Sequence, residues 1–157
     1  MSSRPSPARP VLDDVSKAII EQLQEDGRRA YATIGKAVGL SEAAVRQRVQ
    51  RLVESGVVQI VAVTDPLQVG FPRQAMIGVR SDGDTEELAA ALAAIPEVDY
   101  VVVTAGGFDV LAEVVCEDDD HLLEVLNRKI RPLPGVRSTE TFVYLKLHKQ
   151  LYNWGTR

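Results

Sequence analysis

The fold of this chain is decided by residues 31–52, YATIGKAVGLSEAAVRQRVQRL. Apolar side chains surround Gly39 in this stretch, and Ser41 follows shortly after it. Glycine adopts the left-handed conformation that ends a helix, and a serine hydroxyl satisfies a free backbone N–H where the next helix begins. Gly35 costs about 1 kcal/mol relative to alanine inside a helix, which indicates that packing requires a small residue there. The stretch predicts two short helices joined by a tight turn.

The second of these helices has two different faces. Val45, Val49 and Leu52 recur at the spacing of a buried stripe. Arg and Gln occupy the opposite side, where they can bind guanine and adenine in the DNA major groove. An ordinary surface helix is the alternative, and Arg48 is expected to contact phosphate or to form an intramolecular ion pair. The predicted DNA-binding residues are Ser41, Glu42, Ala43, Arg46, Gln47, Gln50 and Arg51.

The composition is that of a globular protein with one or two small domains, because the chain has 157 residues, 45% of them hydrophobic and 25% charged. The net charge of −4 is unevenly distributed. Residues 1–64 hold 9 basic and 7 acidic side chains, whereas residues 65–157 hold 9 and 15. Only the N-terminal part is therefore expected to dock on phosphate, and salt should weaken that binding.

No metal, cofactor or membrane partner is expected from the composition. Cys116 is the only cysteine, so an intrachain disulfide is impossible, and its apolar neighbours predict a buried thiol. No apolar run reaches the roughly 18 residues of a membrane span. The first ten residues, MSSRPSPARP, lack the apolar centre of a secretory signal. We expect a cytoplasmic, nucleoid-associated protein.

The rest of the chain divides at a Pro- and Gly-containing stretch, TDPLQVGFP. A first helix is expected at 12–25 and a short strand at 57–63. Beyond the hinge we expect strands at 74–79, 98–104, 109–116 and 136–147 and helices at 84–95, capped by Thr85, and at 119–130. The predicted parts are a flexible arm (1–11), a helix-turn-helix domain (12–63), a hinge (64–72), a second domain (73–147) and a tail (148–157).

The second domain has the βαββαβ order of the ferredoxin-like fold, with a four-stranded antiparallel sheet and two helices on one face. The other face of that sheet has no cover within the domain. Such a face is expected to bury itself against a second copy of the chain. The tail, with Tyr152 and Trp154, is expected either to dock on a neighbouring subunit or to be disordered.

This layout resembles the Lrp/AsnC family of transcription regulators, also called feast/famine regulatory proteins. The resemblance covers about residues 12–147. It is carried by Leu12-Asp13, Asp26-Gly27-Arg28, Val38-Gly39-Leu40-Ser41, Arg48-Val49, Arg51-Leu52, Gly56-Val57-Val58, Asp65-Pro66, Gly107 with Asp109, and Gly135-Val136 followed by Thr139 and Thr141. Ala30 departs from the family, which usually has a capping Ser before the second helix.

The resemblance implies an α+β protein, with a winged helix-turn-helix joined to a RAM or ACT-like effector domain. It further implies homodimers that assemble into tetramers or octamers, promoter DNA as partner, and an amino acid as effector. In such a site Gly106 and Gly107 could offer backbone N–H groups to a carboxylate, and Asp109 could accept from an ammonium group. The remaining candidates are Thr104, Thr139 and Thr141; a plain turn and ordinary strand residues are the alternative.

Two other functions remain open at this stage. Haem-pathway decarboxylases, which act on a siroheme-derived substrate, have the same layout and use histidines, but this chain has only His121 and His148, without neighbouring acid–base partners in sequence. The chain could also be an amino-acid-sensing module that binds proteins rather than DNA. The Arg- and Gln-rich face at 46–50 favours a regulator that is not an enzyme.

Overall fold

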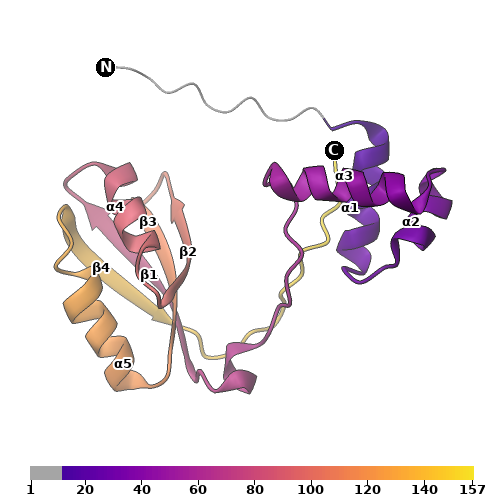
Figure 1. The fold of residues 1–157 in the computed structure, drawn as a ribbon. Coiled ribbons are helices and arrows are strands. Elements are labelled where there is room, and N and C mark those ends of the chain that lie inside the picture. Colours follow the sequence, from indigo (N-terminus) through magenta and orange to yellow (C-terminus); the bar gives the residue numbers. More distant parts are fainter. Residues whose placement is uncertain (1–11) are drawn as a thin grey trace, which may run out of the picture. The chain divides into compact units, whose positions relative to one another are not determined.

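The computed structural model describes residues 12–157, which form two compact units (Figure 1). One unit contains the described residues up to Ala62 together with Lys149–Arg157, and the other is Val63–His148. The predicted N-terminal arm, residues 1–11, lies outside the described residues.

Three helices make up the N-terminal unit: α1 (Asp14–Glu25), α2 (Tyr31–Val38) and α3 (Glu42–Glu54). Helix α1 begins after Asp13, whose carboxylate accepts the backbone N–H of Ser16 at 2.7 Å. The three helices share one apolar cluster, which contains Ile19, Leu23, Ile34, Val45 and Val49. The buried stripe predicted for α3 is therefore confirmed.

The turn between α2 and α3 has the geometry predicted from its glycines and serine. Gly39 has φ 72°, which is the left-handed conformation, and ends α2. The hydroxyl of Ser41 accepts the backbone N–H of Ala44 at 3.2 Å. A Cβ on Gly35 would lie 2.4 Å from the carbonyl oxygen of Leu40. Gly35 is required because the backbone that leads into α3 passes directly against it.

The segment after α3 contains no strand, so the predicted wing is not formed. A strand was expected at 57–63, but these residues pair with no other described segment. β-Branched side chains favour extended backbone, yet a strand needs a neighbour that shares its backbone hydrogen bonds. The hinge contains a 3₁₀ turn, Pro66–Val69, whose N–H at Leu67 is accepted by the Asp65 carboxylate at 3.0 Å.

The second unit has the predicted ferredoxin-like fold. Its elements are β1 (Arg73–Ser81), α4 (Thr85–Ala93), β2 (Val98–Val103), β3 (Val110–Cys116), α5 (Asp119–Glu124) and β4 (Val136–Val143). The strands form one antiparallel sheet in the order β2-β3-β1-β4. This order confirms the split βαββαβ arrangement.

Three boundaries in this unit differ from the prediction. The cap of α4 is Asp84 rather than Thr85, because the Asp84 carboxylate accepts the N–H groups of Glu86 and Glu87 at 2.8 and 3.2 Å. Helix α5 continues as a wider π-helical turn, Val125–Ile130, instead of one regular helix. Strand β4 ends at Val143 and not at residue 147. The Tyr144 N–H still donates to the Gln74 carbonyl at 2.8 Å, but β1 begins at Arg73 and offers residues 146 and 147 no pairing backbone.

Helices α4 and α5 cover one face of the sheet (Figure 1). Alternate residues of β1 and β3 are buried against them, as are the apolar faces of the helices. The opposite face carries Met76, Tyr100 and Phe142, of which Tyr100 is 52% and Phe142 43% exposed. The sheet therefore has one core face and one open face.

The C-terminal tail contacts helix α1 of its own chain. The backbone N–H of Gly155 donates to Gln24 Oε1 at 3.0 Å, and the Thr156 hydroxyl donates to Glu21 Oε1 at 2.6 Å. These contacts anchor the end of the tail within the N-terminal unit, while Tyr152 and Trp154 stay exposed at 51% and 78%, so docking of the tail on a neighbouring subunit stays a prediction.

Candidate nucleic-acid interface and effector loop

The polar face of α3 is open to solvent within the N-terminal unit. On the opposite side, Val45, Val49 and Leu52 are at most 6% exposed. All the residues predicted to contact DNA are exposed: Ser41, Glu42, Ala43, Arg46, Gln47, Gln50 and Arg51. The face can therefore approach a flat or grooved partner without rearrangement of the helix.

Two long side chains on this face are held by neighbours on the same helix. Arg46 Nη2 lies 2.8 Å from Glu42 Oε1, and Gln50 Nε2 donates to Glu54 Oε1 at 2.8 Å. Both pairs have the i,i+4 spacing at which helix side chains meet. Gln47 makes no side-chain hydrogen bond with any described residue, so its amide is available for an external partner.

Arg48 joins α3 to the start of α1. Its Nη1 atom donates to the Asp13 carboxylate at 2.7 Å and to the Ser16 hydroxyl at 3.1 Å. Hydrogen bonds from Ser16 and Arg48 lower the pKa of Asp13 from 3.8 to about 2. Of the two roles left open for Arg48, the intramolecular ion pair is the one observed.

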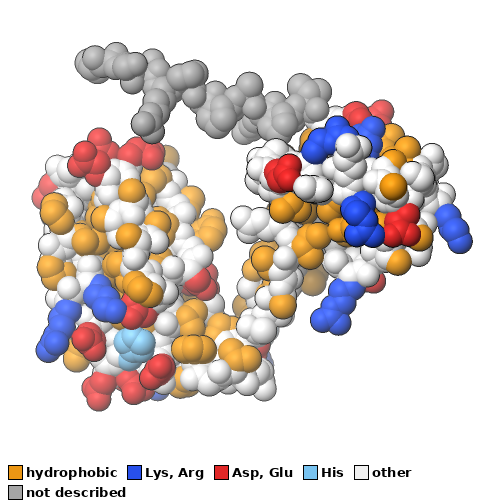
Figure 2. Space-filling model, in the orientation of Figure 1, with side chains coloured by type: hydrophobic (Ala, Val, Ile, Leu, Met, Phe, Trp, Pro, Cys, Tyr) orange, Lys and Arg blue, Asp and Glu red, His pale blue; other side chains and the backbone are white. Residues whose placement is uncertain are grey.

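The surface charge agrees with the uneven charge along the sequence. Figure 2 shows several groups of Lys and Arg over the visible surface of the N-terminal unit, whereas Asp and Glu gather at both ends of the C-terminal unit. Positive side chains attract phosphate, and acidic ones repel it. The N-terminal unit is thus the part of the chain that suits a nucleic acid.

In the C-terminal unit, the loop between β2 and β3 is fixed by its own hydrogen bonds. The Thr104 hydroxyl donates to the carbonyl of Phe108 at 2.6 Å. Asp109 Oδ2 accepts the backbone N–H of Ser81 at 2.8 Å, and its own N–H donates to the carbonyl of Val79 at 2.9 Å. Two residues predicted to contact an effector therefore already have structural partners.

The ring of Phe108 lies on the open face of the sheet, over Gly78. A Cβ on Gly78 would come within 2.6 Å of that ring. The Arg80 guanidinium stacks on the ring at 4.4 Å from its centroid, and Phe142 packs edge-on at 5.9 Å. The aromatic side chain fastens the loop to β1 and leaves Gly106 and Gly107 exposed.

The other predicted effector residues lie on the opposite face. Thr139 and Thr141 pair with Val79 and Ile77, whose side chains are buried toward the helices. Arg131 Nε donates to the Thr139 hydroxyl at 3.2 Å. The structure brings Thr104 and Asp109 together with the glycines, but it does not bring the two β4 threonines to the same side of the sheet as Phe108.

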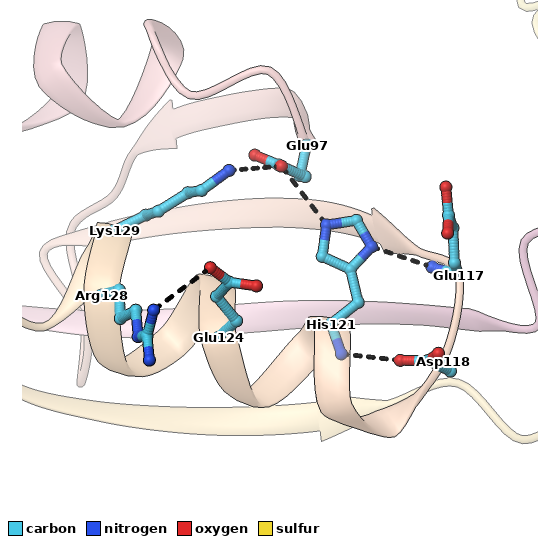
Figure 3. Close-up of polar contacts among 7 residues, drawn as sticks. All are labelled: Glu97, Glu117, Asp118, His121, Glu124, Arg128 and Lys129. Carbon is cyan, nitrogen blue, oxygen red and sulfur yellow. Dashed lines mark hydrogen bonds and ion pairs between the residues drawn. The ribbon is translucent and has the colours of Figure 1, made fainter.

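A cluster of charged side chains between β2 and α5 was not expected from the sequence (Figure 3). Glu97 Oε1 accepts a hydrogen bond from Lys129, which lowers the pKa of the Glu97 carboxyl. The same oxygen lies 3.3 Å from His121 Nε2, and His121 Nδ1 accepts the N–H of Glu117. His121 thus has an acidic neighbour in the fold, but the same carboxylate oxygen is hydrogen-bonded to Lys129. His148 is exposed and lies in a different part of the chain.

Two further expectations concern metals and membranes. Within residues 12–157, no group of three or more His, Cys, Asp or Glu side chains is arranged to hold a metal ion. No helix in that same range is long and apolar enough to cross a bilayer.

Comparison with known proteins agrees with this geometry. Residues 12–53 match the AsnC-type helix-turn-helix domain, and residues 73–157 match a family described as a C-terminal dimeric alpha+beta barrel domain. The chain belongs to the Lrp/AsnC family. It is a DNA-binding transcription regulator of that type. Among relatives of this regulator, the HTH-type transcriptional regulator FL11 of Pyrococcus horikoshii is 36% identical over 141 residues, which span 88% of this chain and 93% of FL11.

Two solved structures resemble this Lrp/AsnC regulator along most of its length. The leucine response regulatory protein LrpA of Mycobacterium tuberculosis has a TM-score of 0.78 and 30% identity, covering 88% of this chain and 96% of LrpA. The regulator NMB0573 of Neisseria meningitidis, in complex with L-Met, has a TM-score of 0.75 and 27% identity, covering 90% and 95%.

One residue beside the candidate interface was missed by the sequence analysis. Tyr31 begins α2, and the Arg46 guanidinium carbon lies 5.2 Å from the centroid of its ring. The two residues are far apart in sequence and on different helices, so no helical periodicity connects them. The Glu42–Arg46 pair, in contrast, could have been read from its i,i+4 spacing.

Proposed function

We propose that this Lrp/AsnC regulator reads its operator with the exposed polar face of α3. The observation that supports this is the exposure of Arg46, Gln47 and Gln50 on one side of a helix whose other side is buried. Arginine binds the O6 and N7 atoms of guanine, and glutamine binds N6 and N7 of adenine. These contacts specify bases, whereas the positive charge of the unit supplies affinity for any duplex.

Selection from a library of randomised DNA duplexes tests this proposal, since it needs no prior operator. The wild type is expected to enrich one consensus, and Arg46→Ala, Gln47→Ala and Gln50→Ala each lose preference at particular positions, at about 1–3 kcal/mol per lost base contact. Glu25→Ala, on α1, is the surface control and removes only the pair of Glu25 with Arg29. An unchanged consensus and affinity in all three α3 variants would remove this face from recognition.

We infer that the C-terminal domain binds an amino acid at the loop around Gly106 and Gly107. Support comes from the exposed backbone of these glycines beside a rigid loop, and from the L-Met complex of the similar regulator NMB0573. Backbone N–H groups suit a carboxylate. Asp109→Ala is a poor test, because it also removes the acceptor of the Ser81 N–H.

A thermal-shift screen with the twenty amino acids gives the ligand, because ligand-linked stabilisation grows with the logarithm of concentration. Gly106→Val and Gly107→Val then test whether the ligand binds at this loop. An added Cβ meets nothing within 4 Å at either glycine, so we expect the baseline melting temperature to change little while the shift disappears. A full shift in both variants would move the ligand elsewhere.

We further propose that the open face of the sheet pairs with a second copy of the chain. Exposed Tyr100 on β2 and Phe142 on β4, with Met76 on β1 beside Phe142, give that face its apolar area. Glu113 on β3 lies between Met76 and Tyr100 on the same face. Phe142→Glu should convert the assembly to monomers in light scattering. Leu123→Glu, at a position of α5 that is 53% exposed, on the helix side of the sheet, should not. Equal masses for the wild type and Phe142→Glu would exclude this face as the interface.

We propose no catalytic activity, since the relatives are named as transcriptional regulators. Incubation with a siroheme-derived tetrapyrrole should leave the absorption spectrum of the pigment unchanged. A spectral shift with bound pigment would favour the decarboxylase alternative.

A further inference from the structure

We propose that Tyr31 is a positioning residue for base recognition, which holds the Arg46 guanidinium for its contact with a base edge. The inference rests on the proposed reading of DNA by α3. It adds Tyr31, a residue of α2 to which no contact with base or phosphate is assigned. The partner of Arg46 on the DNA is expected to be guanine, whose two acceptors match a guanidinium fork.

The geometry places Arg46 between an aromatic ring and a carboxylate. Its guanidinium carbon lies 5.2 Å from the Tyr31 centroid, inside the range of about 6 Å over which a cation is attracted to a ring face. Its Nη2 atom lies 2.8 Å from Glu42 Oε1. Glu42 uses one side of the planar group, so other N–H donors of the guanidinium remain free for a base.

The Tyr31 ring is held by packing, whereas the Arg46 side chain alone would be free to change rotamer. Tyr31 is half-buried and packs against the apolar cluster that joins the three helices. The Arg46 side chain is 62% exposed, and a long exposed side chain samples many rotamers that binding must then freeze. Contacts that restrict the side chain beforehand reduce this entropy loss on binding.

Restriction of Arg46 acts on specificity more than on total affinity. An unrestrained guanidinium can swing to a phosphate and contribute equally on every sequence, while one held beside Tyr31 stays near the face of α3. Loss of the ring is therefore expected to lower the ratio of operator binding to binding of unrelated duplex. A purely structural Tyr31 would instead lower binding to both duplexes alike and reduce thermal stability.

The test uses the full-length chain and two duplexes, the sequence enriched from the randomised library and a scrambled version of it. Tyr31→Phe keeps the ring, and Tyr31→Met keeps apolar volume without it. Both are measured with Arg46 and with Arg46→Ala, together with melting temperatures. Tyr31→Phe should keep the operator-to-scrambled ratio within about twofold, and Tyr31→Met should lower it by about two- to fivefold.

The Arg46→Ala background separates the possible causes. If Tyr31 acts through Arg46, Tyr31→Met should cause no further loss of the ratio there. An equal loss in both backgrounds, or an equal loss on both duplexes, would overturn the positioning role while base recognition by α3 stands. Should Tyr31→Met fail to fold, Tyr31→Leu replaces it, and its effect on the ratio must likewise vanish without Arg46. An unchanged ratio in Arg46→Ala itself would overturn base reading by Arg46 and this inference with it.

Discussion

Arg48 donates to both carboxylate oxygens of Asp13, at 2.7 and 3.0 Å. Asp13 also caps α1 by accepting the N–H of Ser16. One carboxylate thus caps the first helix and joins it to α3, the helix proposed to read DNA. The orientation of α3 depends on this pair as well as on the apolar cluster beneath it.

The Asp13–Arg48 pair should make stability depend on acid pH. Because its hydrogen bonds lower the folded-state pKa of Asp13 to about 2, the stabilisation is complete above the unfolded pKa of about 4 and is lost as pH falls toward 2. Asp13→Asn keeps a capping acceptor but removes the charge. In urea unfolding, the difference between wild type and Asp13→Asn should shrink as pH falls below about 4, and a difference independent of pH would contradict the pair's role.

Gly35→Ala should destabilise the N-terminal unit although alanine favours helices. The helix propensity gain is about 1 kcal/mol, but the new Cβ would meet the Leu40 carbonyl oxygen at 2.4 Å. Overpacking against backbone costs about 1–3 kcal/mol and sometimes more. Ala37→Gly, at an exposed site on the same helix, is the control and should cost about 1 kcal/mol. A stabilised Gly35→Ala would mean that the turn shifts freely.

Cys116 should not react with thiol reagents in the folded protein. Its side chain is fully buried, and burial raises the pKa of its thiol to about 11. The nucleophile is the thiolate, which is scarce and inaccessible under these conditions. Labelling with a disulfide reagent at about pH 8 should follow the rate of unfolding and increase with urea. Fast labelling in native buffer would show that this part of the core opens readily.

Lys129→Met should cost more than the loss of a surface ion pair. Glu97 is 14% exposed, and its Oε2 atom is buried without a partner, so removal of Lys129 leaves the carboxylate poorly compensated. We expect a loss of about 1–3 kcal/mol in unfolding free energy, partly recovered in Glu97→Gln/Lys129→Met. Arg128→Met breaks the exposed pair with Glu124 shown in Figure 3 and should cost at most about 0.5 kcal/mol. Equal costs for both single variants would contradict the structural role.

The local features of the fold were predictable because each depends on neighbouring residues. Gly39 and Ser41 define the turn before α3, and continuous apolar stretches mark β1 and β3, with Glu113 the one polar residue of β3. The strand expected at 57–63 is not formed, because a strand depends on a partner segment and not only on its own residues. β-Branched residues do not supply the hydrogen-bonding partner that a strand needs. At α4, Asp84 and Thr85 are both good caps, and composition alone does not choose between them.

The candidate sites were predictable only where one helix carries them. The exposed face of α3 follows from helical periodicity, so its polar residues could be named in advance. The face on which the β4 threonines lie depends on the register of the sheet, which pairs Thr139 with buried Val79. Two contacts join segments that are distant in sequence: Tyr31 with Arg46, and Glu97 with Lys129. No periodic pattern in the sequence predicts them.

Photo-crosslinking to the enriched operator tests whether the exposed face of α3 lies against base edges. A photoreactive amino acid would be placed at Gln47, on the exposed face of α3, or at Glu25, on α1 of the same unit. We expect crosslinks from position 47 to bases inside the enriched site and none from position 25. Crosslinks to bases from position 25, with none from position 47, would contradict base recognition by this face.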